Sequence, residues 1–174
     1  NFPLFKQVNI NKHKNVVKKI IYQGSVNKDR GIELMIEAML HVNAQLYIVG
    51  DGDVLPKMKQ HAARLKLNDK VIFFGRINFQ DLFTITETAD LGLSFEKDTC
   101  LSYRYSLPNK IFDYINAEIP VLVSDLPEFR RVLNSYNIGS LIDSRDAQSI
   151  AKQINHLLSV PKSTWSSDLR SAKK

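Results

Sequence analysis

Short apolar runs alternate with amphipathic segments along most of the chain. The first run, residues 19–23, ends at Gly24, and the following segment, residues 31–40, has apolar residues at helical spacing. A short β-prone run bounded by glycine is typical of a strand, whereas apolar residues recurring every three or four positions indicate an amphipathic helix. The pattern therefore predicts a strand, a loop and a helix at the start of the folded region.

The same unit recurs about six times. The expected strands are residues 19–23, 45–49, 70–74, 90–95, 120–123 and 138–142. The expected helices are residues 31–40, 54–67, 79–86, a helix with Pro108 at its first position, 126–133 and 147–158. Near-continuous apolar strands that alternate with helices predict an α/β fold, in which a parallel sheet is covered on both faces and ligands bind beyond the carboxyl ends of the strands.

The alternation pauses at one long connection, residues 96–107, before the helix at Pro108. Long loops in compact domains are often functional. Since Pro108 has no N–H, the amides of Asn109 and Lys110 begin the helix unpaired, and such an end binds anions. Asp113 lies one turn further on and could bind the rest of a nucleotide. The alternative is an ordinary amphipathic helix with a surface aspartate.

The first loop contains Lys28 and Arg30 between Gly24 and Gly31. It lacks both the Lys-[Ser/Thr] ending of a P-loop and the G-x-G-x-x-G fingerprint of dinucleotide-binding proteins. Arg30 could grip a diphosphate with two hydrogen bonds, and Lys28 could add a point charge. Solvent-facing turn residues are an equally good interpretation.

Two further glycine-containing turns follow strands. Gly50 and Gly52 are best explained as a tight strand-to-helix turn. Gly75 could let a base lie against the backbone while Ile77 packs on its face, although turn geometry explains them equally well. Because Gly24, Gly50 and Gly75 all follow parallel strands, we expect their loops to meet around one crevice.

No nucleophile–base pair, carboxylate pair or metal-ligand cluster is apparent from the sequence. The single Cys100 has no partner at metal-ligand spacing, and the histidines are scattered at positions 13, 41, 61 and 156. We therefore expect neither a metal nor a cofactor. Catalysis without such groups favours positioning and charge stabilisation of an activated leaving group, such as a nucleoside diphosphate.

Size and composition fit one globular domain, with 174 residues, 44% of them hydrophobic and 24% charged. No apolar run approaches the roughly 20 residues of a membrane span, and the first residues do not resemble a signal peptide, so we expect a cytoplasmic protein.

The net charge of +6 arises largely near the ends of the chain. The clustered lysines are Lys6, Lys12, Lys14, Lys18, Lys19, Lys173 and Lys174. Little aromatic interleaving accompanies them, which argues against a nucleic-acid partner and favours solvated charge. Peripheral attraction to an anionic membrane stays open.

Four segments in order closely resemble the group 1 family of retaining glycosyltransferases. They are residues 22–38, with Tyr-Gln-Gly-Ser at their start, 48–52 (Ile-Val-Gly-Asp-Gly), 71–75 (Val-Ile-Phe-Phe-Gly) and 107–121, with Leu-Pro-Asn-Lys-Ile-Phe-Asp-Tyr at their start. The resemblance spans about residues 19–159. It implies the GT-B architecture, two Rossmann-like domains facing across a cleft, and this chain is similar to the C-terminal, nucleotide-sugar-binding domain, a three-layer α/β/α unit.

The resemblance also implies roles for individual residues. Those expected at the donor diphosphate are Gly24, Ser25, Lys28, Arg30, Asn109 and Lys110. Asp113 matches the second carboxylate of the family's E-x7-E motif, a ribose acceptor, and we expect Arg30 and Asp113 to be the catalytically important pair. Tyr105 stands where the first glutamate of that motif would be, so the sugar contacts are expected from Tyr105, Ser106 and Leu107.

Further expectations concern the base and one departure from the family pattern. The residues expected to border the base are Gly75, Arg76 and Ile77. Glu118 replaces a glycine of the family, and we expect it to be tolerated if it faces solvent.

At the level of the whole protein, the resemblance implies a hexosyltransferase that moves a sugar from a nucleoside diphosphate to a glycan or lipid-linked acceptor in polysaccharide synthesis, with retention of anomeric configuration. We expect three parts: a lead-in at 1–18, the donor-binding domain at 19–160 and a truncated segment at 161–174. A missing N-terminal domain would bind the acceptor, so this part alone is expected to be inactive. The alternatives are a non-catalytic nucleotide-binding scaffold and a sugar-nucleotide 2-epimerase.

Overall fold

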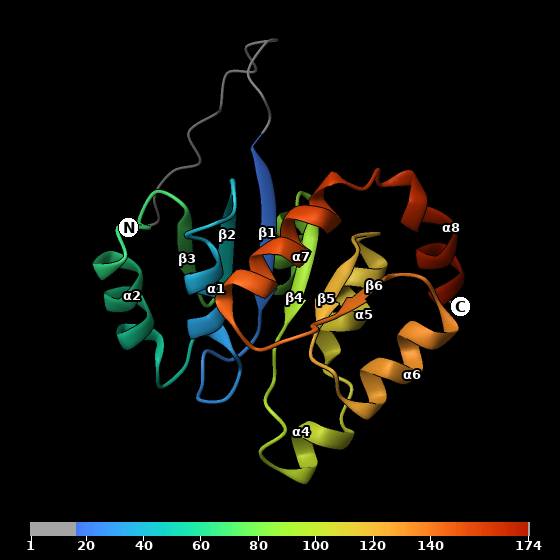
Figure 1. Ribbon diagram of the computed structural model, residues 1–174, viewed down its shortest axis with the longest axis horizontal. Helices are drawn as coiled ribbons and strands as arrows, with labels where there is room; N and C mark the ends of the chain where they lie inside the picture. Colours follow the sequence, from blue (N-terminus) through green and yellow to red (C-terminus); the bar gives the residue numbers. More distant parts are fainter. Residues whose placement is uncertain (1–16, 174) are drawn as a thin grey trace.

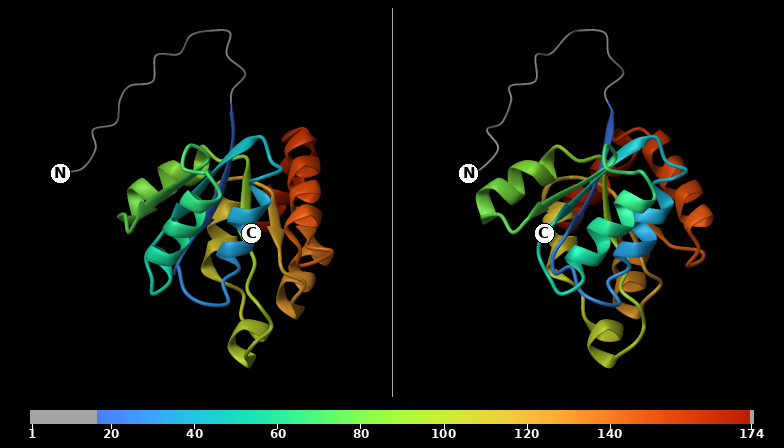
Figure 2. Two further views of the ribbon diagram at one scale, coloured as in Figure 1. Left: turned by 60° about the vertical axis from the view of Figure 1, so that its left-hand side comes forward. Right: turned by 90° about the vertical axis from the view of Figure 1, so that its left-hand side faces the viewer.

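The computed structural model describes residues 17–173 and contains one six-stranded parallel sheet between two layers of helices (Figures 1 and 2). The strand order is β3-β2-β1-β4-β5-β6. The strands are β1 Lys18–Gln23, β2 Ala44–Val49, β3 Val71–Gly75, β4 Leu91–Ser94, β5 Val121–Val123 and β6 Gly139–Leu141. The expected Rossmann-like α/β fold is confirmed.

The helices cover both faces of the sheet. They are α1 Ile32–Ala38, α2 Leu55–Arg64, α3 Phe79–Glu87, α4 Leu101–Tyr105, α5 Asn109–Asn116, α6 Pro127–Ser135, α7 Ala147–Ser159 and α8 Ser163–Ala172. Helix α1 contacts α2 and α7 on one face, and α5 contacts α3 and α8 on the other (Figure 1). Among the described helices none combines the length and apolarity needed to cross a bilayer.

Two expectations about local structure were wrong. The connection 96–107 contains the short helix α4, which projects beyond the carboxyl ends of the strands (Figure 1). Pro108 is the residue that caps α5 rather than its first helical residue, since its ψ of 140° is extended. In its capping position the ring still presets φ, at −64°.

The strand order reverses between β1 and β4, which lie side by side although α1, β2, α2, β3 and α3 separate them in the chain. The loop after β1 and the segment after β4 consequently flank one crevice at the carboxyl edge. In open α/β sheets ligands bind at this reversal point. The fold therefore places the loop of Arg30 opposite the beginning of α5.

Helix α5 is fixed to this point by Tyr114, which is fully buried. Its hydroxyl lies 3.2 Å from the carbonyl oxygen of Leu93 and accepts a hydrogen bond from the backbone N–H of Gln23 at 3.2 Å. A Cβ atom at Gly92 would lie 2.5 Å from the Tyr114 ring, so glycine makes room for the ring on β4. These contacts join α5 to both strands that border the crevice.

The two outer parts of the expected division can be described only in part. Residues 1–16 of the expected lead-in, with several of the clustered lysines, lie outside the described residues. In the expected C-terminal segment, α8 buries Trp165 and Leu169.

Glu118 follows the end of α5 with a φ of 54°, a left-handed conformation that favours glycine. Its partly exposed side chain accepts hydrogen bonds from Lys173 at 2.9 Å and Arg170 at 3.4 Å, which link the end of α5 to α8. These ion pairs accompany a glutamate at a position where the resemblance implies glycine.

Candidate functional site

A cavity of about 430 Å³ lies at the carboxyl edge between β1, α3, α4 and α5. Most of the residues that the sequence predicts for the site line it: Gly24, Ser25, Arg30, Ser106, Leu107, Asn109, Lys110 and Asp113. The other predicted residues, Lys28, Gly75, Arg76, Ile77 and Tyr105, do not line it. The cavity thus brings together the diphosphate and ribose candidates.

The three glycine loops lie side by side, but of the three glycines only Gly24 lines the cavity, so the expectation that all three loops meet around one crevice is not met there. The N–H of Gly24 donates to the carbonyl of Val49 at 2.9 Å, and the N–H of Gly50 donates to the carbonyl of Gly75 at 2.8 Å. A Cβ atom at Gly50 would lie 1.9 Å from the carbonyl oxygen of Gly24, so the two loops are in direct contact. Gly75 ends β3, two strands away from β1, at the outer side of this row.

Two cations form one wall of the cavity and share a buried carboxylate. Oε1 of Glu96 accepts from Nζ of Lys110 at 2.9 Å and from Nη1 of Arg30 at 3.3 Å. Its other oxygen, Oε2, accepts from the hydroxyl of Ser94 at 2.7 Å. The side chain of Glu96 is 1% exposed and that of Lys110 is 7% exposed. Burial raises the pKa of Glu96, but the charge and hydrogen bond of Lys110 outweigh it, so the pKa lies below its ordinary value.

The stability of the domain should therefore depend on pH through Glu96. A carboxylate whose pKa is lowered in the folded state stabilises it above the unfolded value, here 4.5, and the contribution disappears as the pH falls through the folded value. Glu96→Gln should lower the free energy of unfolding by roughly 3 kcal/mol at pH 7, because one partner of a buried pair loses its charge. In urea titrations, the difference in free energy of unfolding between Glu96→Gln and the original protein should become smaller below pH 4.5. A difference that stays constant with pH would contradict this assignment.

Glu96 was missed by the sequence analysis, which treated it as the first residue of a loop. The available signal was a carboxylate two residues after a fully buried strand, at the edge where ligands bind. Its partners Arg30 and Lys110 are 66 and 14 residues away in the chain. That three-way contact is a tertiary feature.

Arg30 also contacts α4. Its guanidinium carbon lies 4.6 Å from the ring centroid of Tyr103, and its Nε is buried without a hydrogen-bond partner in the described part of the chain. Tyr103 and Ser102 line the cavity, whereas Tyr105 is 60% exposed outside it. Of the three residues expected to contact the sugar, Ser106 and Leu107 line the cavity and Tyr105 does not. Ser102 and Tyr103 were not predicted.

Asp113 is held by a chain of side-chain hydrogen bonds. Nε2 of Gln23 donates to Oδ2 of Asp113 at 2.6 Å, and the hydroxyl of Thr86 donates to Oε1 of Gln23 at 2.8 Å. Burial raises the pKa of Asp113, while the hydrogen bond from Gln23 opposes this effect. Oδ1 has no hydrogen bond to the described residues. Thr86 thus orients Gln23, and Gln23 orients a carboxylate whose second oxygen can accept from a ligand.

The first turn of α5 opens onto the same cavity. The N–H of Ile111 donates to the carbonyl of Pro108 at 3.0 Å. Among residues 17–173, the backbone N–H groups of Asn109 and Lys110 have no backbone partner. Free N–H groups and the positive end of the helix dipole favour an anion at this point.

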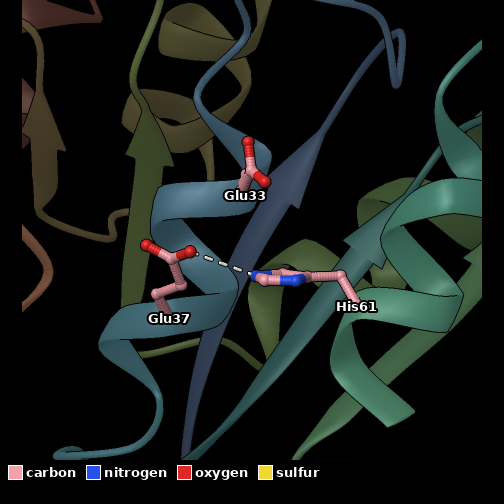
Figure 3. Close-up of side chains that lie close together, drawn as sticks. All are labelled: Glu33, Glu37 and His61. Carbon is pink, nitrogen blue, oxygen red and sulfur yellow. Dashed lines mark hydrogen bonds and ion pairs between the residues drawn. The ribbon is translucent and has the colours of Figure 1, made fainter. Parts of the chain in front are cut away.

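One group of possible metal ligands lies elsewhere, between α1 and α2 (Figure 3). Nε2 of His61 lies 3.2 Å from Glu37, with Glu33 one turn away on α1, and Nδ1 of His61 lies 3.3 Å from the guanidinium of Arg64. Both ring nitrogens therefore have protein partners, one of them a cation. This group explains a contact between two helices and does not line the cavity.

Relatives of known sequence cover the chain and extend well beyond it. An uncharacterized glycosyltransferase of Methanocaldococcus jannaschii is 25% identical over 146 residues, which are 82% of this chain and 36% of that protein. A chitobiosyldiphosphodolichol beta-mannosyltransferase of Candida albicans is 23% identical over 154 residues, which are 84% of this chain and 32% of that protein. The chain spans about a third of the length of these relatives.

Similar solved structures have the same fold. HepE of Anabaena, solved in complex with UDP and glucose, superimposes on this chain with a TM-score of 0.74 at 16% identity, and the match covers 90% of this chain and 42% of HepE. The sequence model for group 1 glycosyl transferases matches residues 4–170. The fold is that of the C-terminal half of a GT-B protein, and the chain belongs to the group 1 family of glycosyltransferases.

Proposed function

We propose that this chain is the donor-binding domain of a glycosyltransferase that moves a sugar from a nucleoside diphosphate to an acceptor hydroxyl in glycan or polysaccharide synthesis. The carrying observation is one cavity that combines two cations, the open amide end of α5 and an oriented carboxylate. These groups match the diphosphate and the ribose of a nucleotide. The HepE structure, which holds UDP and glucose, supports a uridine nucleotide as one candidate donor.

The diphosphate would lie between Arg30, Lys110 and the amides of Asn109 and Lys110. Nη2 of Arg30 has no hydrogen-bond partner among the described residues, so the guanidinium can donate to a phosphate beside its bond to Glu96. Negative charge grows on the diphosphate as the bond to the sugar breaks. Cations and amides already in place stabilise that charge without rearrangement, which lowers the barrier to transfer.

The ribose would bind to Asp113 through its free Oδ1. The base would extend toward Gly75, Arg76 and Ile77 at the end of β3, and mostly backbone would face it. For the sugar, Ser106 and Leu107 line the cavity together with Ser102 and Tyr103 of α4. Tyr105 would reach the sugar only if α4 moved, and Lys28 would reach the diphosphate only if its loop moved.

The rest of the proposed reaction lies beyond this domain. We propose that the whole enzyme transfers a hexose with retention of anomeric configuration and without a metal or cofactor. The acceptor, a glycan or a lipid-linked molecule, would bind to a further domain, so this part alone would be inactive. The proposal also includes peripheral association with a membrane. The two alternatives, a non-catalytic nucleotide-binding scaffold and a sugar-nucleotide 2-epimerase, are not favoured by the glycosyltransferase relatives.

The ribose contact provides the test of this proposal. In calorimetric titrations at fixed salt, we expect one of UDP, GDP and ADP to bind, and its 2′,3′-dideoxy analogue to bind about tenfold more weakly, a loss of roughly 1.4 kcal/mol. Asp113→Asn should bind the two forms equally, because Gln23 keeps the amide oxygen as its acceptor and the NH2 group left facing the ribose cannot accept from the hydroxyls.

Thermal unfolding gives the control, since Asp113→Asn keeps the shape of the side chain and removes a charge that burial disfavours. The variant should be at least as stable as the original protein near neutral pH. Absence of binding by the folded protein to all three nucleotides would reject the proposed donor site. Equal ribose preference in both proteins would reject the role of Asp113.

A further inference from the structure

Both cationic side chains that line the cavity are bound to one carboxylate that does not line it. Glu96 lies behind Arg30 and Lys110 and contacts each through the same oxygen, Oε1. The ammonium of Lys110 also lies 4.2 Å from the ring centroid of Tyr22, and a Cβ atom at Gly24 would lie 3.5 Å from Cε of Lys110. Lys110 is therefore packed on several sides and not free to sample the cavity.

Glu96 is itself held in place from behind. The hydroxyl of Ser94 donates to its Oε2 at 2.7 Å, and the hydroxyl of Ser124 donates to its backbone carbonyl at 2.7 Å. The guanidinium of Arg145 donates to the neighbouring carbonyl of Phe95 at 2.8 Å. The carboxylate thus has a fixed position relative to the ends of β4 and β5, and its two cationic partners are positioned by it.

We propose that Glu96 is a positioning residue for the donor diphosphate: it holds the Arg30 guanidinium and the Lys110 ammonium side by side, aimed at the same ligand, without touching the nucleotide itself. The inference rests on the proposed donor site. Two like charges on one wall repel each other, and a carboxylate between them removes that cost before the ligand arrives. Groups fixed in advance lose less conformational entropy on binding than groups that must be ordered by the ligand.

The carboxylate of Glu96 also lowers the net charge of the cavity wall. Arg30, Lys110 and Glu96 together carry a net charge of +1, so the wall attracts a diphosphate less strongly by charge than two free cations would. The affinity for the diphosphate would then depend on the placement of the cations more than on their number. If Glu96 places the cations, its removal weakens diphosphate binding. If Glu96 only offsets their positive charge, its removal strengthens diphosphate binding.

The experiment compares a nucleoside diphosphate with the corresponding monophosphate on Glu96→Gln. UDP and UMP, or the pair whose base the protein prefers, are titrated calorimetrically at one salt concentration. We expect the affinity for the diphosphate to fall at least tenfold and that for the monophosphate to change less than threefold, because only the second phosphate needs both cations. Tighter diphosphate binding, or equal losses for both nucleotides, would overturn the proposal.

Glu33→Gln is the matched control, because it removes the same charge from an exposed position on α1, and it should leave both affinities unchanged. If Glu96→Gln does not fold, Glu96→Asp provides the same comparison, since it keeps the charge but withdraws it from Arg30 and Lys110. The same selective loss of diphosphate affinity is then expected.

Amine acetylation followed by mass spectrometry tests the positioning without any nucleotide. Lys110 should react more slowly than the exposed Lys59 in the original protein and at least fivefold faster in the Glu96 variant than in the original. Equal shielding of Lys110 in both proteins would overturn the inference about Glu96. Failure of the original protein to bind any nucleotide would instead reject the donor site.

Discussion

Alanine at Gly31 is expected to lower the free energy of unfolding by roughly 4 kcal/mol or to prevent folding. Gly31 caps α1 with a φ of 74°, where a Cβ atom costs about 1–2 kcal/mol. That Cβ atom would also lie 2.4 Å from both Cβ and the carbonyl oxygen of Phe95. Overpacking of this kind costs about 1–3 kcal/mol, occasionally more, since backbone must shift. Urea unfolding followed by circular dichroism measures the sum.

Gly75→Ala separates the two contributions. Gly75 has nearly the same φ, 68°, but a Cβ atom at this position would meet no other atom within 4 Å among the described residues. We therefore expect a loss of only about 1 kcal/mol, the cost of the left-handed backbone alone. Equal losses at the two glycines would show that the contact with Phe95 has no energetic weight.

The Gly31 contact also explains what the sequence could and could not predict about this loop. Two glycines that flank basic residues predicted unusual backbone geometry, and both Gly24 and Gly31 have positive φ. The reason for glycine at position 31, however, is the backbone at the end of β4, 64 residues further along the chain. The local pattern therefore predicts the backbone conformation of Gly31, but only the packing against Phe95 explains why no larger residue fits there.

The six strands were predictable because each is a short apolar run between turn residues, and a parallel sheet buries such runs on both faces. Helices with a full apolar face, such as α5 and α7, were predictable for the same reason. Helix α4 was not, since its five residues bury no side chain and show no helical period. Helix α8 was missed because only Trp165 and Leu169 mark its buried side.

For the site, the sequence predicted groups that act through the backbone or through a motif. The amides of α5 and the loop of Arg30 are of this type, and both line the cavity. The supporting side chains were missed: Gln23 contacts Asp113 across 90 residues and Thr86 across 63. Such contacts depend on the strand reversal between β1 and β4, which no single segment of the chain reveals.

The largest effect on ligand binding is expected from Arg30→Ala, which should weaken binding of the preferred nucleoside diphosphate about 100-fold. Hydrogen bonds to a charged group contribute roughly 1.5–3 kcal/mol, and a factor of 100 corresponds to about 2.7 kcal/mol. The change also frees Oε1 of Glu96 from one of its two cations and removes the stacking partner of Tyr103. Calorimetric titration at fixed salt measures the loss.

Lys28→Ala is the matched control for Arg30→Ala, because it removes one positive charge from the same loop at an exposed position outside the cavity. If the affinity comes from long-range attraction by the positive charge of the loop, both variants should lose the same amount of affinity for the diphosphate. High salt should then abolish the difference in affinity between each variant and the original protein. If the guanidinium binds the diphosphate directly, Lys28→Ala should stay within threefold of the original. Arg30→Lys should then recover only part of the affinity, since an ammonium supplies the charge but not the two parallel hydrogen bonds of the guanidinium fork.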